Sequence, residues 1–344
     1  MPELRRGPIT DRWVIIAPER AKRPSDYHTE GNDKSERSPH NCPFSPGNEE
    51  MTPPEIHHIT GEDGSWRVRV VPNKFPAMQD YPELGRTAVN GIYDRMNGIG
   101  THEVVIETPS HDQEIPDLPV EQVKLIVDAY VLRLQELMKN DWYRYVLLFK
   151  NHGKRAGASL SHPHSQIIAT PVIPRQVRDR LQTAREYYER KERCLFCDVM
   201  LMELKSGERI IEATDEFVVF TPYDSRFPFE LVIYPRKHAH EFTQICEEQR
   251  WALARILKRT LFRLNRLLGD PPYNLVLHNS PNPIPRPGKP GYWATLQYDY
   301  HWRIAIIPRL TTVAGFEWGT GLYINPMPPE DAARYLREVE VPED

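Results

Sequence analysis

Two stretches of the chain carry apolar residues at the spacing of an amphipathic helix, residues 120–139 and residues 247–268. The apolar positions of the first are Val123, Val127, Tyr130, Leu134 and Leu137, and those of the second are Trp251, Ile256, Leu261 and Leu268. Short apolar runs precede both stretches, at 103–106 and 230–233, and follow them, at 145–149 and 273–277. The pattern predicts two helices, each flanked by strands.

The two helical stretches lie within the same order of features, which indicates an internal duplication. Cys42-Pro43-Phe44-Ser45 corresponds to Cys194-Leu195-Phe196-Cys197, and Asn73-Lys74-Phe75-Pro76 corresponds to Ser225-Arg226-Phe227-Pro228. A repeat this long indicates duplicated domains and excludes a solenoid. We therefore expect an α+β fold of two units, residues 1–175 and 176–344, each an antiparallel sheet with a helix packed on it. A polar segment with a charged helical run, residues 177–190, marks the boundary.

The segment Ser161-His162-Pro163-His164-Ser165-Gln166 precedes an apolar run. In an extended strand, side chains at i and i+2 lie on the same face, so His162, His164 and Gln166 would line one face. Upstream, residues 151–159 form a polar, glycine-bearing loop whose backbone N–H groups can approach an anion. An imidazole nucleophile beside a phosphate-binding loop indicates phosphoryl or nucleotidyl transfer through a phosphohistidine. The alternative is a surface strand with solvated histidines.

The second half combines two cysteines and two histidines suited to a tetrahedral zinc site. These residues are Cys194, Cys197, His238 and His301. The alternative is a pair of buried thiols with two unrelated histidines. The matching set in the first half is Cys42, Ser45, His111 and His162. Because a serine hydroxyl does not readily lose its proton, the sequence leaves occupancy of this first site open, with His57 or His58 as substitute ligands.

The duplication also separates the two halves by chemistry. Arg303 stands in the second half where His164 stands in the first. Only the first half therefore keeps the histidine that could act as a nucleophile. We expect the second half to provide mainly structural support, with substrate contacts as a further role.

Composition narrows the class of protein. The 344 residues carry a formal net charge of −4, and no lysine/arginine block reaches five residues, which argues against nucleic-acid binding. No stretch approaches about 18 consecutive apolar residues, so we expect a soluble, cytoplasmic protein without a membrane span. Four cysteines in so long a chain do not form a disulfide framework, and the spacing of two of them, Cys194 and Cys197, fits metal ligation better.

Taken together, these motifs resemble the galactose-1-phosphate uridylyltransferase family, a branch of the histidine-triad superfamily. The resemblance covers the whole chain. It is carried by Arg20-Ala21-Lys22-Arg23-Pro24, Cys42-Pro43-Phe44, Asn73 with Phe75, Asn151 to Ser159, His162 to Gln166, and Gly315-Phe316-Glu317. It implies that each chain is a tandem pair of histidine-triad-like units and that two chains form a homodimer. The implied substrates are a nucleotide sugar and a sugar-1-phosphate or phosphate.

The resemblance also implies roles for individual residues. His164 would attack the α-phosphorus and hold the nucleotide, while Gln166 would hydrogen-bond the non-bridging phosphate oxygens. Gln166 replaces a third histidine of hydrolytic relatives, which would let the covalent intermediate await an acceptor. Glu317 would contact sugar hydroxyls across a dimer interface. The remaining substrate-binding positions are Arg20, Arg23, Asn73, Phe75, Asn151, Gly157 and Ser159.

The chain departs from the transferase pattern at Thr311, Phe316 and Tyr323, where the transferase carries lysine, tyrosine and glutamine. The segment 315–326 looks more like the ADP-glucose phosphorylase branch. The leading hypothesis is a UDP-glucose–hexose-1-phosphate uridylyltransferase, and the alternative is an ADP-glucose phosphorylase or adenylyltransferase of the same fold. A third hypothesis is a zinc-containing nucleotide-binding module without turnover. The base and the acceptor stay open.

Overall fold

The structure is a computed structural model that describes residues 1–20, 24–27 and 39–342. Its main element is one antiparallel sheet of ten strands, in the order β10-β11-β12-β14-β13-β8-β9-β7-β4-β3. The strands from the first half are β3 (His57–Thr60), β4 (Trp66–Pro72), β7 (Thr101–Ile106), β8 (Tyr145–His152) and β9 (His164–Thr170). Those from the second half are β10 (Ile210–Ala213), β11 (Phe217–Phe220), β12 (Leu231–Pro235), β13 (Tyr273–His278) and β14 (Arg303–Pro308).

The strand order repeats in the two halves, which confirms the tandem duplication. Reading inward from either edge, each half shows a hairpin, a third strand, the strand that begins two residues after His162 or His301, and a central strand. The two sheets are joined where β8 pairs with β13, with Leu148 opposite Leu277 and His152 opposite Tyr273. The predicted pair of sheets therefore forms a single continuous sheet.

The two predicted amphipathic helices, α1 (Val120–Met138) and α4 (Glu247–Leu268), pack together on one face of this sheet. All five predicted apolar positions of α1 are buried. In α4, Ile256, Leu261 and Leu268 are buried as well. Trp251 is an exception to the predicted stripe. It is half-buried, and its ring lies near the Lys124 ammonium group at 5.7 Å and the Arg255 guanidinium at 5.7 Å, because this turn of α4 lies at the edge of the core.

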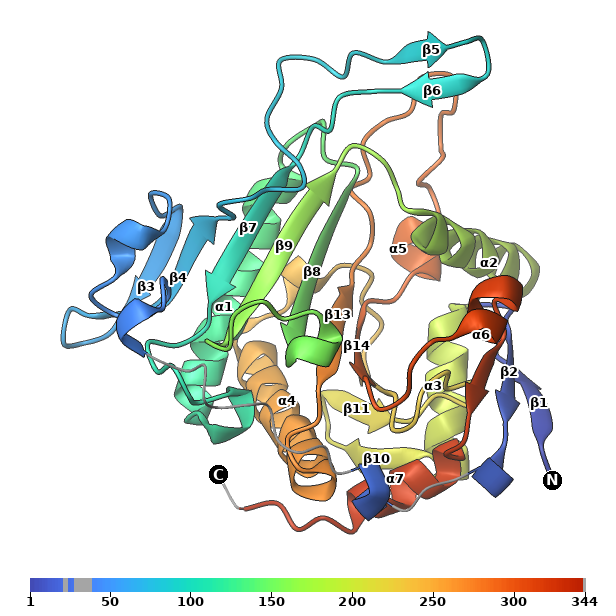
Figure 1. Cartoon of the computed structure of the whole chain (residues 1–344). Helices are drawn as coiled ribbons and strands as arrows, with labels where there is room; N and C mark the ends of the chain where they lie inside the picture. Colours follow the sequence, from blue (N-terminus) through green and yellow to red (C-terminus); the bar gives the residue numbers. More distant parts are fainter. Residues whose placement is uncertain (21–23, 28–38, 343–344) are drawn as a thin grey trace.

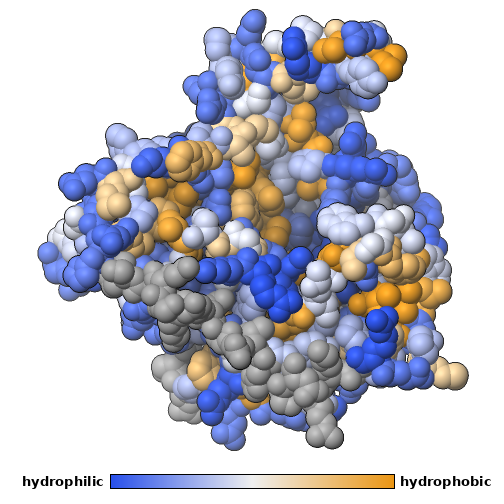
Figure 2. Space-filling view, in the orientation of Figure 1, coloured by the Kyte–Doolittle hydropathy of each residue, from blue (hydrophilic) through white to orange (hydrophobic). Residues whose placement is uncertain are grey.

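The other face of the sheet is covered differently in the two halves. In the second half, α2 (Arg175–Lys191) and α3 (Leu195–Ser206) bury Ala184, Phe196 and Met200 against β11, β12 and β14. In the first half, a loop carrying Cys42 and Phe44 packs on Val71, Val104 and Ile106. On this face of β8 and β9 the side chains of Phe149, Asn151, Gln166 and Ile168 are only half-buried. Figure 2 shows a hollow with apolar side chains in this region.

The remaining elements are short. The N-terminal strands form a small sheet in which β2 pairs with β1 and, in parallel, with β15, so the N-terminus lies beside the second half (Figure 1). The β5–β6 hairpin projects from the end of the main sheet. The bounds are β1 (Glu3–Arg6), β2 (Trp13–Ile16), β5 (Thr87–Val89), β6 (Tyr93–Arg95), β15 (Tyr323–Asn325), α5 (Leu296–Asp299), α6 (Gly315–Thr320) and α7 (Pro329–Arg337). The 3₁₀ helices are η1 (Pro18–Arg20), η2 (Pro24–Tyr27), η4 (Pro39–Asn41), η5 (Glu49–Met51), η6 (Ile115–Asp117), η7 (Lys154–Ala156) and η8 (Phe242–Gln244). Within the described residues, no helix combines the length and apolarity needed to cross a bilayer.

A buried ion pair ties α1 to the sheet. Arg133 on α1 donates through Nε to Glu103 Oε2 at 2.9 Å and through Nη2 to Oε1 at 2.8 Å. Glu103 is 2 % exposed, so its carboxylate has lost its hydration and depends on this bidentate contact.

Replacing Arg133 by methionine should therefore lower the free energy of unfolding by about 3 kcal/mol, because it leaves a charged carboxylate buried without its partner. Urea denaturation measures the change. The control is the double variant Arg133→Met/Glu103→Leu, which should recover most of the loss since an apolar pair replaces the ion pair. A single variant as stable as the unmodified protein would contradict this account.

Candidate active site and metal centres

His164 is the first residue of β9, directly after Pro163, which lacks the N–H group needed to continue the strand ladder. The Nδ1–H of His164 donates to the carbonyl oxygen of His162 at 2.8 Å. This bond leaves the lone pair on Nε2. The ring is 6 % exposed, and burial lowers the pKa of His164 from 6.5, with the Lys150 cation acting in the same direction. A neutral imidazole with a free Nε2 is the form that can act as a nucleophile.

Gln166 lies on the same face of β9 as His164, as the sequence predicts, and is held by a residue that the sequence analysis missed. His102 on β7 accepts at Nδ1 from the backbone N–H of Ala77 at 3.2 Å, so its proton is on Nε2. This Nε2–H donates to Gln166 Oε1 at 2.8 Å. The contact orients the Gln166 amide, whose NH₂ group is left to meet a ligand. The sequence pattern that could have indicated the position of His102 is its alternation with Val104 and Ile106, which places these three side chains on one strand face.

Asn73 and Phe75 lie beside this group. The Asn73 amide nitrogen is 3.2 Å from His102 Nε2, and Asn73 Oδ1 accepts from the Phe75 backbone N–H at 2.9 Å. Phe75 is 83 % exposed. An exposed aromatic side chain on a fixed turn offers a surface for stacking.

The loop after β8 turns at two glycines with positive φ, Gly153 at 80° and Gly157 at 95°. Gly157 adopts the left-handed conformation that disfavours a side chain, and a Cβ there would lie 3.6 Å from the Asn151 amide nitrogen. Asn151 Oδ1 accepts from Asn274 Nδ2 at 2.8 Å, and Asn274 Nδ2 also donates to the Ala156 carbonyl at 2.8 Å. A strand of the second half thus holds the loop of the first. Ser159 is exposed at the end of this loop.

A buried charged network supports β9 from behind. Ser165 and Tyr130 both donate to Glu107 Oε1, and Lys150 donates to Glu107 Oε2 at 2.7 Å. Lys150 also lies 3.0 Å from Glu114, which contacts His152 at 3.1 Å. Burial alone would lower the pKa of His152, but the carboxylates of Glu114 and Asp270 raise it to about 9. The network fixes the ends of β7, β8 and β9 and was not predicted.

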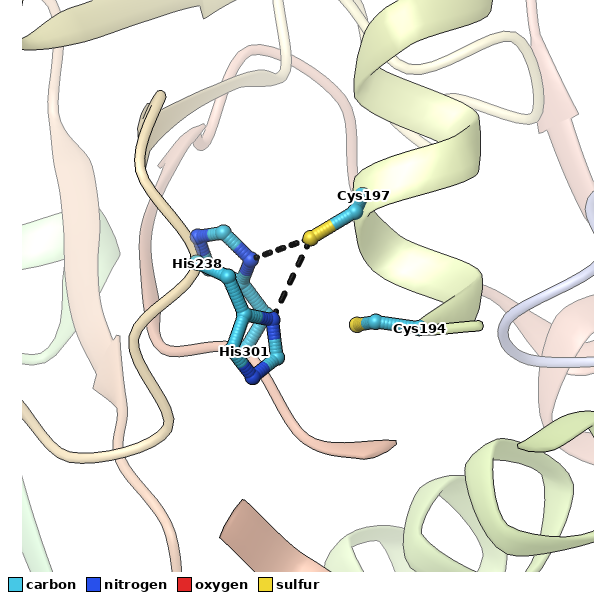
Figure 3. Close-up of side chains that lie close together, drawn as sticks. All are labelled: Cys194, Cys197, His238 and His301. Carbon is cyan, nitrogen blue, oxygen red and sulfur yellow. Dashed lines mark hydrogen bonds between the residues drawn. The ribbon is translucent and has the colours of Figure 1, made fainter. Parts of the chain in front are cut away.

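The predicted ligand set of the second half comes together at the start of α3 (Figure 3). Cys197 Sγ lies 3.2 Å from Nδ1 of His238 and 3.2 Å from Nδ1 of His301. Each ring donates its Nε2–H to a backbone carbonyl, His238 to Gln297 at 2.9 Å and His301 to Pro235 at 2.9 Å. Both Nδ1 lone pairs therefore point to the cysteines, with the carbonyls as the outer partners that zinc-binding histidines use. The donor set and its tautomers fit a tetrahedral zinc ion.

The matching set of the first half is also brought together, and every member is buried. His162 Nδ1 lies 3.3 Å from His111 Nδ1 and 3.7 Å from Cys42 Sγ, while its Nε2–H donates to the Thr108 carbonyl at 2.8 Å. Ser45 Oγ lies 3.3 Å from His111 Nδ1, at the place of the fourth ligand. Of the substitutes considered, His58 instead contacts Glu55 at 2.8 Å.

Two predicted substrate-binding residues, Arg20 and Glu317, are not gathered at His164 within this chain. Arg20 is exposed at the end of η1, and Arg23 lies outside the described residues. Glu317 is in α6, where its Oε2 accepts from the Ala314 backbone N–H at 3.0 Å. Figure 1 shows α6 beside β2 and α2, away from β9.

Comparison with known proteins agrees with this architecture. Family models described as the N-terminal and C-terminal domains of galactose-1-phosphate uridyl transferase match residues 1–174 and 180–341. ADP-glucose phosphorylase of Arabidopsis thaliana is 37% identical over 341 residues, 99% of this chain and 93% of that protein. Galactose-1-phosphate uridylyltransferase of Thermotoga maritima is 30% identical over 348 residues, 99% of each chain.

A crystal structure of an ADP-glucose phosphorylase from Arabidopsis thaliana with bound ADP-glucose superimposes with a TM-score of 0.82 at 36% identity. The match covers 99% of this chain and 100% of that one. The matched regions include both halves, the histidine motif and both cysteine–histidine groups. The chain belongs to the galactose-1-phosphate uridyl transferase family.

Proposed function

We propose that the protein transfers a nucleotidyl group from a nucleotide sugar to a phosphate-bearing acceptor through a covalent intermediate on His164. The observation that carries the proposal is the hydrogen bond from His164 Nδ1–H to the His162 carbonyl, which leaves the Nε2 lone pair without a partner among the described residues. The relatives named above are nucleotidyl-transferring enzymes of the same family.

In the first step, His164 Nε2 attacks the α-phosphorus. An N–P bond forms, the bond to the bridging oxygen breaks, and the sugar-1-phosphate leaves with its electron pair. In the second step, a phosphate oxygen of the acceptor attacks the same phosphorus and the N–P bond breaks, which returns neutral His164. The carbonyl of His162 stabilises the positive charge that the ring carries between the two steps.

Gln166 serves this reaction as a hydrogen-bond donor to the non-bridging oxygens. Its Oε1 is engaged by His102, so its NH₂ group is the part presented to the phosphate. An amide has no titratable proton near neutral pH and cannot activate water as a general base. The intermediate therefore persists until an acceptor arrives. The proposed cradle around it consists of Asn73, Phe75, Asn151, Gly157 and Ser159.

ADP-glucose is the donor that the comparisons favour, with inorganic phosphate as the acceptor. The A. thaliana ADP-glucose phosphorylase has the higher identity of the two relatives, 37% against 30%. The residues at 311, 316 and 323 also depart from the uridylyltransferase pattern. The second candidate is uridylyl transfer between UDP-glucose and galactose-1-phosphate, which the name of the T. maritima relative supports.

We further propose that zinc in the Cys194, Cys197, His238 and His301 site is structural, because four protein ligands leave no position for substrate. The first-half site would bind metal more weakly through Cys42, His111 and His162, since Ser45 replaces the second thiol. Each half, 1–175 and 176–344, would thus be stabilised around its own metal centre.

A homodimer accounts for the distance between α6 and His164. Phe316 and Trp318 in α6 are 44 % and 79 % exposed, and Trp13 on β2 is 45 % exposed. Figure 2 shows apolar residues gathered on this side of the molecule. Burial of this surface against a second copy would allow Glu317 to reach the partner's sugar site.

Incubation with ADP-glucose or UDP-glucose in the absence of an acceptor should leave one nucleotidyl group on His164, which peptide mass spectrometry locates. We expect the AMP adduct on His164 to form from ADP-glucose at least about tenfold faster than the UMP adduct forms from UDP-glucose. His164→Ala should abolish the adduct and turnover while the far-UV spectrum stays unchanged. His58→Ala is the matched control and should react normally. An adduct on His162, or turnover without any adduct, contradicts the mechanism.

His102→Ala should lower kcat by about tenfold to a hundredfold with a smaller change in KM, because Gln166 loses the contact that orients it. Steady-state kinetics measures both constants. His102→Asn, which retains an N–H donor, should recover part of the loss, and His57→Ala on β3 should behave like the unmodified protein. Equal kinetics for His102→Ala would mean that Gln166 is oriented by other contacts.

Purified protein should contain about one zinc ion per chain after dialysis against a weak chelator, and Cys197→Ser should remove it and lower the melting temperature. Elemental analysis and thermal unfolding provide the two readouts. Cys42→Ser is the matched variant in the first half and should leave the strongly held zinc in place. Loss of that zinc from Cys42→Ser alone would reverse the assignment of the stronger site.

A further inference from the structure

The second half contains a cavity on the face of the sheet that corresponds to the His164 face of the first half. It has a volume of about 400 Å³ and lies between α3 and the strands β11, β12, β13 and β14. Arg303 and His278 form part of its wall. The residues of this cavity have no role in the reaction proposed for the first half.

The strand register makes this cavity the counterpart of the active site. Arg303 on β14 is paired with His278 on β13. In the first half, Phe149 on β8 is paired with Gln166 on β9, so the next pair on that face is Asn151 and His164. Arg303 thus occupies the place of His164, and His278 that of Asn151. The description of the first-half face as an active site rests on the proposed function. The charges described next do not depend on it.

Arg303 is a buried cation without a carboxylate partner among the described residues. It is 5 % exposed, and its Nη1 atom is buried without a hydrogen-bond partner. The guanidinium is held between aromatic rings, 4.9 Å from the Phe196 centroid and 6.0 Å from the Tyr234 centroid. A buried polar group of this kind is costly unless a ligand satisfies it.

A second arginine adds to the positive charge. Arg180 of α2 lines the same cavity, and its Nη1 donates to His278 Nδ1 at 3.4 Å. Burial, reinforced by the Arg303 and Arg226 cations, lowers the pKa of Arg180 to about 10. Burial and the same three arginines hold the pKa of His278 far below its usual value, so this ring is a neutral acceptor.

The acidic residues of the cavity are already engaged. Glu230 pairs with Arg226 at 3.1 Å, and Glu203 pairs with Arg209 at 2.9 Å. The other two are Asp198, which accepts from Tyr187 and Arg193, and Asp224, which accepts from Thr10. In the part of the chain that the structure describes, Arg180 and Arg303 are therefore the cavity arginines without an ion-pair partner.

We propose that this cavity binds a small organic phosphate monoester, with its phosphate group on Arg303 and Arg180. Guanidinium groups match the geometry of phosphate oxygens, and a buried pair of them would bind a dianion strongly. The volume exceeds that of an inorganic anion, and Ile9, Val199 and Phe220 provide an apolar wall for a ring or carbon skeleton. The duplicated half would thus retain anion binding after the histidine nucleophile was replaced.

Isothermal titration calorimetry with AMP on the full-length, zinc-replete protein tests the proposal. The unmodified protein should bind AMP at two sites per chain, one in each half. Arg303→Met should weaken one of them by roughly tenfold or more, as expected when a charged hydrogen bond to phosphate is lost. Arg180→Met should weaken the same site, whereas Arg255→Met, an exposed arginine on α4, should have no effect. The value of kcat should stay unchanged in Arg303→Met, which separates this result from any failure of the reaction proposed at His164.

Adenosine and inorganic phosphate serve as the comparison ligands. Adenosine should not bind at the Arg303-dependent site, and inorganic phosphate should bind there more weakly than AMP.

Thermal unfolding gives a second measurement. Arg303→Met should melt at a higher temperature than the unmodified protein without ligand, because a buried unpaired charge is removed, and AMP should stabilise it less. Identical AMP isotherms for Arg303→Met and the unmodified protein, or equal binding of adenosine, would overturn the proposal.

Discussion

The pairing of β8 with β13 is the interaction on which the rest of the structure depends. It joins two five-stranded sheets into one and fixes the register between the halves over the pairs from Tyr273–His152 to Leu277–Leu148. It also places Asn274 where it can hold Asn151 and the turn at Ala156. The loop next to His164 is therefore shaped by a strand from the other half of the chain. An isolated first half would lack this support.

The same junction explains why two similar halves can differ in chemistry. Their helices α1 and α4 share one core on one face of the sheet, so the opposite faces can change independently. In the second half, α2 and α3 cover that face and bring Cys194 and Cys197 to the two histidines. In the first half, the loop at Cys42 and Phe44 crosses that face, and the Phe44 ring packs edge-to-face with both His162 and His164. The two halves therefore differ on this face of the sheet because different segments cross it.

Local spacing was enough to predict the helices, the duplication and the same-face placement of His164 and Gln166, since these follow from periods of about 3.6 and 2 residues. The two ligand groups were found because the duplication aligned their members. Contacts between distant strands were not predictable in this way. His102 reaches Gln166 through the β7–β9 pairing, and Asn274 reaches Asn151 through the β8–β13 pairing. Trp251 fits the helical period and yet lies at the edge of the core, because periodicity does not show where a packed layer ends.

His162 combines three constraints in a single residue. Its Nε2–H is bound to the Thr108 carbonyl, its Nδ1 faces Cys42 and His111, and its own carbonyl accepts the His164 proton. One side of the residue thus faces the candidate metal ligands and the other faces His164, the proposed nucleophile, with Pro163 between the two histidines to limit backbone freedom. If the proposed roles hold, a substitution at His162 would disturb the metal group and the orientation of His164 together, because the same residue contacts both.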